Sequence, residues 1–466
     1  MDLQQLVRVA NFLGVNAARP TQQGHPNAAK IGILGASQVS TYAVIWPSRH
    51  LEAANIAAVA ARSEGRAKMF AKQHGIPRSY GSYKELLTDP DLDAVYIGLP
   101  NGLHGQWARH ALESGKHVLC EKPFCTNAAE ARELQSLALE KGLICREAFH
   151  YREHPLATRL REITLGPPCH SLEPPTLPQW MVPPAAAGGA GGLLGKLESI
   201  DVQVLIPKWV FGDTNIRFLE ELAGGAMMDA GTYAVSIMRL LTGSEPRVES
   251  ASASMRPGSK VVDGAMRARL SWDSGIAGTL HASLQHEGWL PVTEVQVEGE
   301  RGCLTCKGFI VPFFGNSLRV TTTQAGSMVL SDPAALSYDK GAAATAAAMS
   351  NPAFTGSKSK QGEEKRGRGD QVQWTERVFG EKQQTSYYHQ LERFTTDLQL
   401  LEGRRADRDA GNVKAACAFD AYDSVANAAI LDACFEAAGL PLRMPTAEWQ
   451  QQQQQQQQQY QQQLEK

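Results

Sequence analysis

The chain has 466 residues, of which 43% are hydrophobic and 20% are charged. Its 46 basic and 48 acidic residues nearly cancel. This balance argues against a nucleic-acid binder or a polybasic membrane binder, because both need a positive field. Apolar runs such as residues 53–61 are far shorter than the ~20 residues that span a bilayer. Transmembrane and fully disordered proteins are thereby excluded, and the length indicates two or three domains at ~150 residues each.

Eight cysteines are scattered along the chain, too few for a disulfide-stabilised scaffold of this length. Reduced thiols in a cytosolic compartment are therefore expected. Cys303 and Cys306 form a lone CxxC pattern without the second pair that a zinc site needs, so no metal is expected. Residues 1–29 form an N-terminal tail that lacks the compact apolar segment of a secretory signal, which predicts a cytoplasmic protein. Organellar targeting by this tail is the open alternative.

Strand-like and helix-like patterns alternate between residues 30 and 150. Short apolar runs predict strands at 31–34, 55–61, 94–99, 117–120 and 143–145. The segments between them predict helices that end near 49 and span 63–74, 103–114 and 128–141. Strands separated by helices of this length require right-handed crossovers, which predicts an N-terminal Rossmann domain with a doubly wound parallel sheet.

A different pattern begins after residue 150, where apolar and polar positions alternate. It predicts strands at 197–205, 265–272, 277–284, 293–298 and 318–323, with helices at 227–241, 388–401 and 413–437. We expect a second α/β domain over residues 151–445 with an open, mainly antiparallel sheet, covered on one face.

Three segments have the composition of surface insertions or tails. Residues 167–195 are rich in Pro, Ala and Gly, and residues 331–381 have low hydrophobicity and a charged run. Both are expected to be mobile insertions. Residues 446–466 are mostly glutamine and are expected to be a disordered tail.

The first predicted strand leads into a candidate phosphate loop, Gly32-Ile-Leu-Gly35-Ala-Ser37-Gln-Val-Ser40. Small residues there let the backbone approach a pyrophosphate, and the following helix N-terminus supplies amide donors. Only the first position of the GxGxxG pattern is glycine, so an ordinary strand–turn–helix is the open alternative. The candidate cofactor residues of this loop are Gly32, Gly35, Ala36, Ser37, Gln38 and Val39.

The second predicted strand ends without an acidic residue at its tip. NAD-specific Rossmann domains carry Asp or Glu there for the ribose 2′-hydroxyl. Here Arg62 and Ser63 precede the first acid, Glu64. Their side chains suit a 2′-phosphate, which favours NADP over NAD.

Four motifs in order resemble the Gfo/Idh/MocA oxidoreductase family. They are Leu99-Pro-Asn101-Gly-Leu-His104, Glu121-Lys122-Pro123, Glu147-Ala-Phe-His150-Tyr151-Arg152 and Gly224-Gly225-Ala-Met-Met-Asp229-Ala-Gly231-Thr-Tyr233. The branch they resemble most contains NADP-dependent D-xylose dehydrogenases and trans-1,2-dihydrobenzene-1,2-diol dehydrogenases. The resemblance covers residues 30–165, 196–325 and 385–445.

The resemblance implies roles for individual residues. Lys122, Asp229 and Tyr233 match the catalytic positions of the family. Arg152 and Arg217 match positions that line the substrate cleft. The positions implied around the cofactor are Pro100, Asn101, His104, Glu121 and Lys122.

The residues themselves support an acid–base set. Asp229 and Tyr233 are four apart on a predicted helix and so share a face, and Lys122 follows a parallel strand at the sheet edge where ligands bind. An unperturbed tyrosine pKa near ~10 is too high for a base, and a nearby ammonium is expected to lower it. Taken singly, each residue also fits a structural role, and His104, His150 and His154 are expected to be hydrogen-bonded structural residues.

These features together predict an NADP-dependent dehydrogenase that oxidises a ring hydroxyl of a sugar, such as D-xylose, to a lactone. A trans-dihydrodiol dehydrogenase and a non-catalytic NADP-binding regulatory protein are the alternatives. The partners expected are a small-molecule substrate and further copies of the chain in a dimer or tetramer.

Overall fold

The computed structural model describes residues 27–166, 192–323, 365–366, 372–378, 385–401 and 410–448, with single positions up to 455. Most of the two predicted insertions and of the glutamine-rich tail lies outside these residues. Where they are described, two expectations need correction. Residues 372–376 form a strand of the second sheet, and Thr446 is buried against the main body of the protein.

The first half of the chain forms a six-stranded parallel sheet with the order β3-β2-β1-β4-β5-β6. This order is that of a Rossmann domain, and it confirms the predicted doubly wound sheet. The strands are β1 (Ala29–Leu34), β2 (Ala54–Ala60), β3 (Arg78–Tyr80), β4 (Ala94–Ile97), β5 (His117–Cys120) and β6 (Cys145–Glu147). The longer helices between them are α4 (Glu64–His74), α5 (Tyr83–Leu87), α6 (His104–Glu113) and α7 (Ala128–Lys141).

The helix boundaries follow local sequence signals. Ser63 and Asn127 accept backbone hydrogen bonds as the N-caps of α4 and α7, and Gly142 ends α7 with a φ of 65°. The segment after β1 is less regular than predicted, because a π-helical turn over Thr41–Ile45 separates α2 (Gln38–Ser40) from α3 (Trp46–Ser48).

The second sheet has nine strands and is mainly antiparallel, as predicted. Among the described residues its order is β14-β15-β13-β12-β11-β7-β10-β9-β8, and of these strands only β7 and β10 pair in parallel. The bounds are β7 (Leu197–Pro207), β8 (Arg247–Met255), β9 (Asp263–Ser271), β10 (Ala277–His286), β11 (Val292–Gly299), β12 (Gly302–Lys307), β13 (Ser317–Thr322), β14 (Lys365–Arg366) and β15 (Val372–Glu376).

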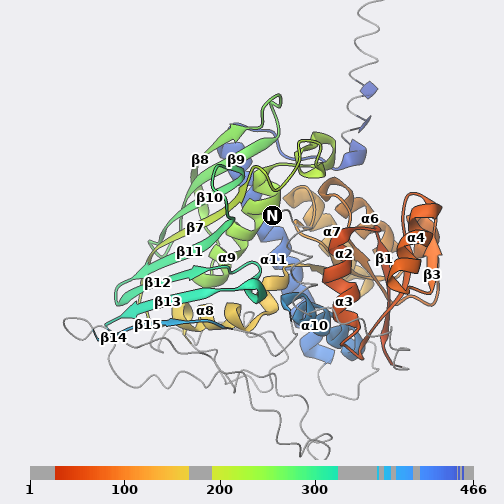
Figure 1. The fold of residues 1–466 in the computed structure, drawn as a ribbon, viewed down its shortest axis with the longest axis horizontal. Helices are drawn as coiled ribbons and strands as arrows, with labels where there is room; N and C mark the ends of the chain where they lie inside the picture. The colour runs from red at the N-terminus through yellow and green to blue at the C-terminus, as the bar shows by residue number, and fades with distance from the viewer. Residues whose placement is uncertain are drawn as a thin grey trace, which may run out of the picture.

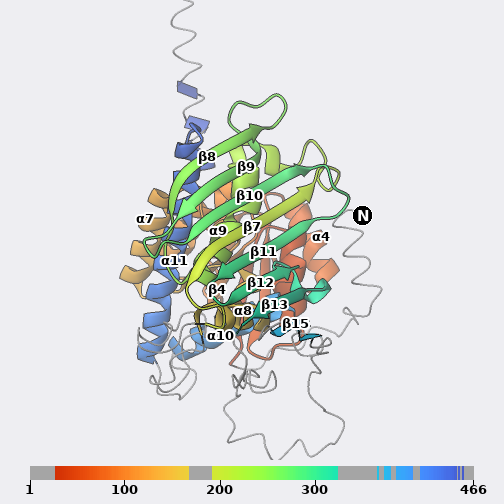
Figure 2. The same ribbon diagram turned by 90° about the vertical axis from the view of Figure 1, so that its left-hand side faces the viewer.

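One face of this sheet packs on helices, and the other faces outward. Inward side chains such as Val202, Leu280 and Val295 share a core with the apolar face of α9 (Thr232–Thr242). Figure 2 shows the opposite face without a described helix over it, and outward residues such as Arg267 and Arg269 are exposed. A dimer or tetramer stays a prediction.

The two sheets lie side by side with helices between them (Figure 1). The helices α8 (Pro155–Leu165) and α9 belong to the second half, whereas α10 (Ser386–Leu401) returns to the first sheet. Leu391 and Phe394 of α10 share a core with Ile31 and Ile33 of β1. Packing therefore joins the end of the chain to its beginning.

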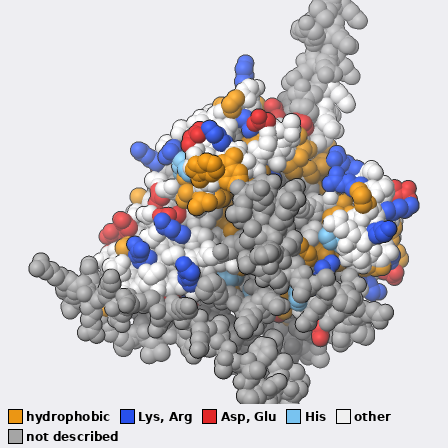
Figure 3. All heavy atoms as spheres, in the orientation of Figure 1, with side chains coloured by type: hydrophobic (Ala, Val, Ile, Leu, Met, Phe, Trp, Pro, Cys, Tyr) orange, Lys and Arg blue, Asp and Glu red, His pale blue; other side chains and the backbone are white. Residues whose placement is uncertain are grey.

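The described side chains visible on one face of the molecule are mixed in charge (Figure 3). Acidic and basic side chains are interspersed on the face drawn in Figure 3, in agreement with a net charge of −2. Among the described helices, none combines the length and the apolar character that a membrane crossing requires.

Candidate active site

The loop after β1 is shaped by Gly35, whose φ is 107°. A Cβ atom on Gly35 would lie 2.7 Å from the carbonyl oxygen of Gly98, so only glycine lets the ends of β1 and β4 come this close. The loop therefore lies where the strand order reverses, which is the ligand-binding crevice of doubly wound sheets.

The two serines in place of glycines bind each other. Ser37 Oγ lies 2.7 Å from Ser40 Oγ, and Ser40 Oγ donates to the Gly35 carbonyl at 3.1 Å. Gln38 is exposed, while Val39 packs against the core of the first sheet. Gly32 lies within β1, where a Cβ would clash with the side chains of Leu86 and Leu92. Glycine at this position therefore leaves space for these two leucines to pack against the strand. Contact of these residues with a cofactor stays a prediction.

A second basic residue, which the sequence analysis missed, reaches the same loop. Arg66 Nη2 donates to the Ala36 carbonyl at 3.0 Å, and Ser63 Oγ accepts from Arg66 N at 3.5 Å. Burial raises the pKa of Tyr83, and Arg62 and Arg66 oppose that rise, which places both guanidinium groups near the Tyr83 hydroxyl. The signal in the sequence was an arginine in the first turn of the helix that Ser63 caps.

Arg62 also lines a cavity of about 750 Å³ between the two halves of the molecule. Its walls include Tyr83 and Trp107, whose rings meet edge to face with centroids 4.8 Å apart. Leu219 and Leu222 form the wall from the second half. The volume and the apolar, aromatic walls suit a flat organic group beside a cationic side chain.

Lys122 follows β5 and reaches across to the second half of the molecule. Its Nζ lies 2.7 Å from Asp229 Oδ1 and 3.1 Å from the Asp229 carbonyl oxygen. Arg217 Nε donates to the other oxygen, Oδ2, at 2.9 Å. Burial alone would raise the pKa of Asp229, but Arg217 and Lys122 outweigh it and lower that pKa, so the carboxylate is ionised.

The segment that carries Asp229 is not the regular helix that was predicted. Met227–Gly231 forms a π-helical turn, and α9 begins at Thr232. Turns of this kind are common at functional sites. Asp229 and Tyr233 still meet the same group, because Lys122 Nζ also lies 4.9 Å from the centre of the Tyr233 ring.

Tyr233 is a buried, protonated phenol. Burial, followed by the charges of Glu121 and Asp229, raises its pKa well above the usual range. The expectation that the Lys122 ammonium brings this pKa below the usual tyrosine value is therefore wrong. The Tyr233 hydroxyl lies 3.4 Å from His150 Nε2, so His150 is a neighbour of the site that sequence reasoning treated as structural.

Three of the side chains expected to line the cofactor pocket, those of Asn101, His104 and Glu121, bind other groups of the protein. His104 Nδ1 and Nε2 lie 2.8 Å from the carbonyl oxygens of Pro123 and Leu99. Asn101 Nδ2 donates to the Ala223 carbonyl at 3.2 Å, and Glu121 accepts from Tyr96 at 2.8 Å. Pro100 precedes the short 3-10 turn Asn101–Leu103. Direct contact of Pro100, Asn101, His104 and Glu121 with a cofactor stays a prediction.

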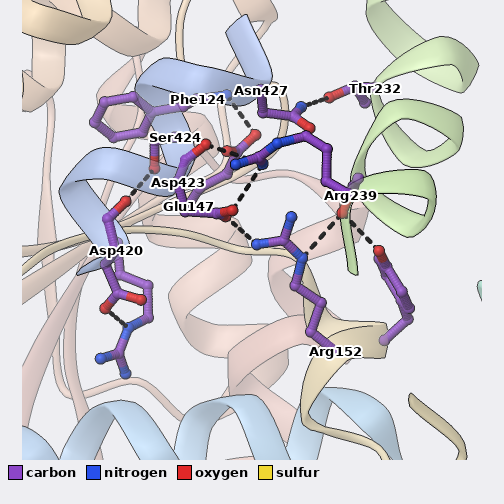
Figure 4. Close-up of polar contacts among 12 residues, drawn as sticks. Phe124, Glu147, Arg152, Thr232, Arg239, Asp420, Asp423, Ser424 and Asn427 are labelled. Atoms are coloured by element: carbon purple, nitrogen blue, oxygen red, sulfur yellow. Dashed lines mark hydrogen bonds and ion pairs between the residues drawn. The ribbon is translucent and has the colours of Figure 1, made fainter. Parts of the chain in front are cut away.

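Arg152 lies away from this group, in a buried ionic network. Its guanidinium pairs with Asp423 of α11 (Ala410–Ala437) and donates to Ser236 Oγ at 2.9 Å. Arg239 Nη1 contacts the other oxygen of Asp423 at 2.7 Å (Figure 4). The contacts of Arg152 give it a structural role, so its predicted contact with substrate has no support from this geometry.

Comparisons with known proteins agree with the fold and the motifs. The model of an oxidoreductase family with an NAD-binding Rossmann fold matches residues 29–149. The model of the GFO/IDH/MocA C-terminal domain matches residues 189–305.

Curated relatives include dehydrogenases. D-xylose 1-dehydrogenase (NADP(+)) 2 of Haloferax volcanii is 36% identical over 252 residues, which cover 54% of this chain and 68% of the relative. Trans-1,2-dihydrobenzene-1,2-diol dehydrogenase of Oryctolagus cuniculus is 31% identical over 257 residues, which cover 54% and 67%.

A solved structure with the same fold is that of KijD10, a 3-ketoreductase from Actinomadura kijaniata in complex with NADP and TDP-benzene. The TM-score is 0.62 at 20% identity, and the match covers 88% of this chain and 98% of the other. At this identity the likeness shows the fold alone.

Proposed function

Because the chain belongs to the Gfo/Idh/MocA oxidoreductase family, we propose that it is an NADP-dependent dehydrogenase acting on a ring hydroxyl of a sugar such as D-xylose, with a lactone as product. The observation that carries the proposal is the position of Lys122. Asp229 of the second half holds its ammonium, at 2.7 Å, beside Tyr233 and at the carboxyl edge of the Rossmann sheet.

The described residues fit a bound dinucleotide. Gly35 leaves room at the loop, and the cavity beside Arg62 is large enough for a flat ring. Arg62 and Arg66 suit a 2′-phosphate through charge-assisted hydrogen bonds. The cofactor supplies the acceptor for the hydride.

The side chains around Lys122 handle the hydroxyl proton. Ionised Asp229 orients the Lys122 ammonium, which can donate to the substrate oxygen and stabilise negative charge there. Burial, and then Lys122, lowers the pKa of His150 to about 3, so its ring is neutral. His150 Nδ1 lies 2.8 Å from Ser386 Oγ, and with its hydrogen on Nδ1 the neutral ring accepts a hydrogen bond from the Tyr233 hydroxyl at Nε2. This contact orients the phenol toward the substrate oxygen, whose proton is released to water as the hydride leaves.

The first experiment is a spectrophotometric assay of cofactor reduction. NADP⁺ and NAD⁺ are each mixed with D-xylose, D-glucose or a trans-dihydrodiol, using the wild type, Lys122→Met and Lys307→Met. Lys307 is an exposed residue of β12 and serves as the matched control. We expect reduction of NADP⁺ by a sugar, lost only in Lys122→Met.

Each other outcome changes the proposal. Reduction by the dihydrodiol alone would identify a dihydrodiol dehydrogenase. NADP binding without any reduction would favour a regulatory protein. Arg62→Ala and Arg66→Ala are expected to weaken NADP⁺ binding by about 10-fold or more and to leave NAD⁺ unchanged; equal losses for both cofactors would contradict the 2′-phosphate assignment.

A further inference from the structure

The chain passes between the two halves of the molecule after its last long helix, α11. Arg443 is buried in the second half, where Nη2 pairs with Asp263 Oδ1 at 2.7 Å and Nε donates to the Gly224 carbonyl at 3.1 Å. The carbonyl oxygen of Arg443 accepts a hydrogen bond from Asn127 Nδ2 of the first half, at 3.0 Å. This one residue therefore binds both halves.

Thr446, three residues further on, contacts both halves as well. Its hydroxyl donates to the Glu221 carbonyl of the second half at 2.7 Å. The same oxygen lies against Gly102 of the first half, where a Cβ atom would clash with it. Thr446 is only 6% exposed, whereas Ala447 and Glu448 beside it are exposed. The Thr446 side chain therefore lies between the two halves.

The same segment forms part of the wall of the cavity beside Arg62. Thr446 and Gln450 line this cavity, which has a volume of about 750 Å³. The other walls come from both halves, with Arg62 and Trp107 from the first and Leu219 from the second. We call residues 443–448 together with Gln450 the C-terminal strap. The strap joins the two halves at the place where the cavity lies between them.

The position of Arg62 indicates which end of a dinucleotide this cavity suits. Arg62 follows β2, and in Rossmann domains the residue after this strand binds the ribose of the adenosine. Lys122, the candidate catalytic residue, is not among the residues that line the cavity. We therefore expect adenine and its ribose, rather than nicotinamide, to lie beside the strap.

We propose that the C-terminal strap forms one wall of the adenosine site and, by joining the two halves, keeps that site in its ligand-binding arrangement. The proposal rests on the NADP-dependent function proposed above. Binding costs less free energy when the walls of a site are already held in the bound arrangement. Loss of the strap should therefore weaken nucleotide binding, although Lys122, Asp229 and Tyr233 stay in place.

Two truncations of the full chain test the strap. The first ends at Pro445, so it lacks Thr446 and Gln450 but keeps the buried ion pair of Arg443. The second ends at Gln451 and is the matched control, because it lacks only residues beyond the strap. Calorimetric titration measures the binding of NADP⁺ and of adenosine 2′,5′-bisphosphate, which carries the adenine and the 2′-phosphate without the nicotinamide.

We expect the dissociation constants of both ligands to rise by about 10-fold or more in the first truncation and to stay unchanged in the second. Equal binding by the wild type and the first truncation would overturn the role of the strap and leave the proposed function intact. Weaker binding of NADP⁺ alone, with unchanged binding of the bisphosphate, would overturn the assignment to the adenosine end. A wild type that binds neither ligand would contradict the NADP-dependent function, and the role of the strap with it.

Hydrogen exchange on the full-length protein tests the strap without a truncation, and it decides if the first truncation does not fold. Adenosine 2′,5′-bisphosphate should slow amide exchange in the peptide that contains Thr446 and Gln450, because a ligand against the strap opposes its local opening. The strand β8, at the edge of the second sheet, is the internal reference and should exchange at the same rate with and without ligand. Exchange in the strap that the bound ligand does not change would overturn the proposal.

Discussion

Two aspartates in this protein each lie between two cations, yet their surroundings differ. Asp229 binds Lys122 and Arg217, and these three side chains are 13%, 12% and 30% exposed. Asp423 binds Arg152 and Arg239, and these side chains are only 10%, 6% and 5% exposed. In both cases burial raises the carboxyl pKa, but the two cations outweigh it and lower the pKa.

The difference lies in what each aspartate joins. Asp423 ties α11 to α9 and to the turn after β6, so its partners are fixed parts of the core. Asp229 holds a lysine that comes from the end of a Rossmann strand, at the edge where ligands bind. The same ion-pair chemistry therefore serves stability in one place and orients a candidate catalytic group in the other.

Neutralising Asp229 should have the largest effect, and it should fall on turnover. Asp229→Asn removes the charge that orients Lys122, and we expect kcat to fall by about 10² to 10⁴-fold. Because the lowered pKa of Asp229 means that its charge also stabilises the folded state, Tm should fall as well. Steady-state kinetics and thermal unfolding measure the two quantities. A large drop in Tm with normal kcat would show that Asp229 is structural, like Asp423.

Neutralising Asp423 should instead unfold the protein more easily. Asp423→Asn leaves Arg152 and Arg239 buried without a full counter-charge, which costs about 3–5 kcal/mol in comparable pairs. Urea denaturation gives the free energy of unfolding, and kcat of the remaining folded protein should stay near that of the wild type. A stability loss below ~1 kcal/mol would show that solvent reaches this network.

The pH dependence of the free energy of unfolding distinguishes the contribution of Glu147 from that of its neighbour Asp423. Burial, opposed by Arg152 and reinforced by Asp423, raises the pKa of Glu147 to about 8. The folded state thus binds this proton more tightly than the unfolded chain, where the pKa is near ~4.3. The stabilisation is complete below ~4.3 and is lost as pH rises toward 8, by a few kcal/mol in order of magnitude. In Glu147→Gln this part of the pH dependence of unfolding should vanish, and an unchanged profile would contradict it.

The exposed ion pair between Lys208 and Glu287 is expected to contribute the least to stability among the ion pairs compared. Its side chains are 61% and 79% exposed, so water and salt screen the attraction. We expect Glu287→Gln to change the free energy of unfolding by less than ~0.5 kcal/mol and to leave kcat unaltered. A larger change, measured in the same urea assay, would show that exposure is a poor guide to ion-pair strength here.

Elements with strong local signals were predicted to within one or two residues. Ser63 and Asn127 begin α4 and α7, because their side chains accept hydrogen bonds from free backbone N–H groups of the first turn. Gly142 ends α7, because glycine adopts the positive φ of the helix end without strain. The strand β8 was missed, because Arg247–Met255 alternates small and polar residues at the sheet edge and buries little on either face. The π-helical turn at Met227–Gly231 leaves no mark in a 3.6-residue pattern.

The sequence by itself determined the two kinds of sheet, the glycine at the tight turn after β1, and the motif residues Lys122, Asp229 and Tyr233, because each depends on local periodicity, local backbone geometry or motif spacing. Only the tertiary structure decided which charges meet. Lys122 and Asp229 are 107 positions apart, and Arg152 and Asp423 are 271 positions apart. Burial and charge pairing then set the pKa of Tyr233 opposite to expectation, because both depend on which groups surround the phenol in space.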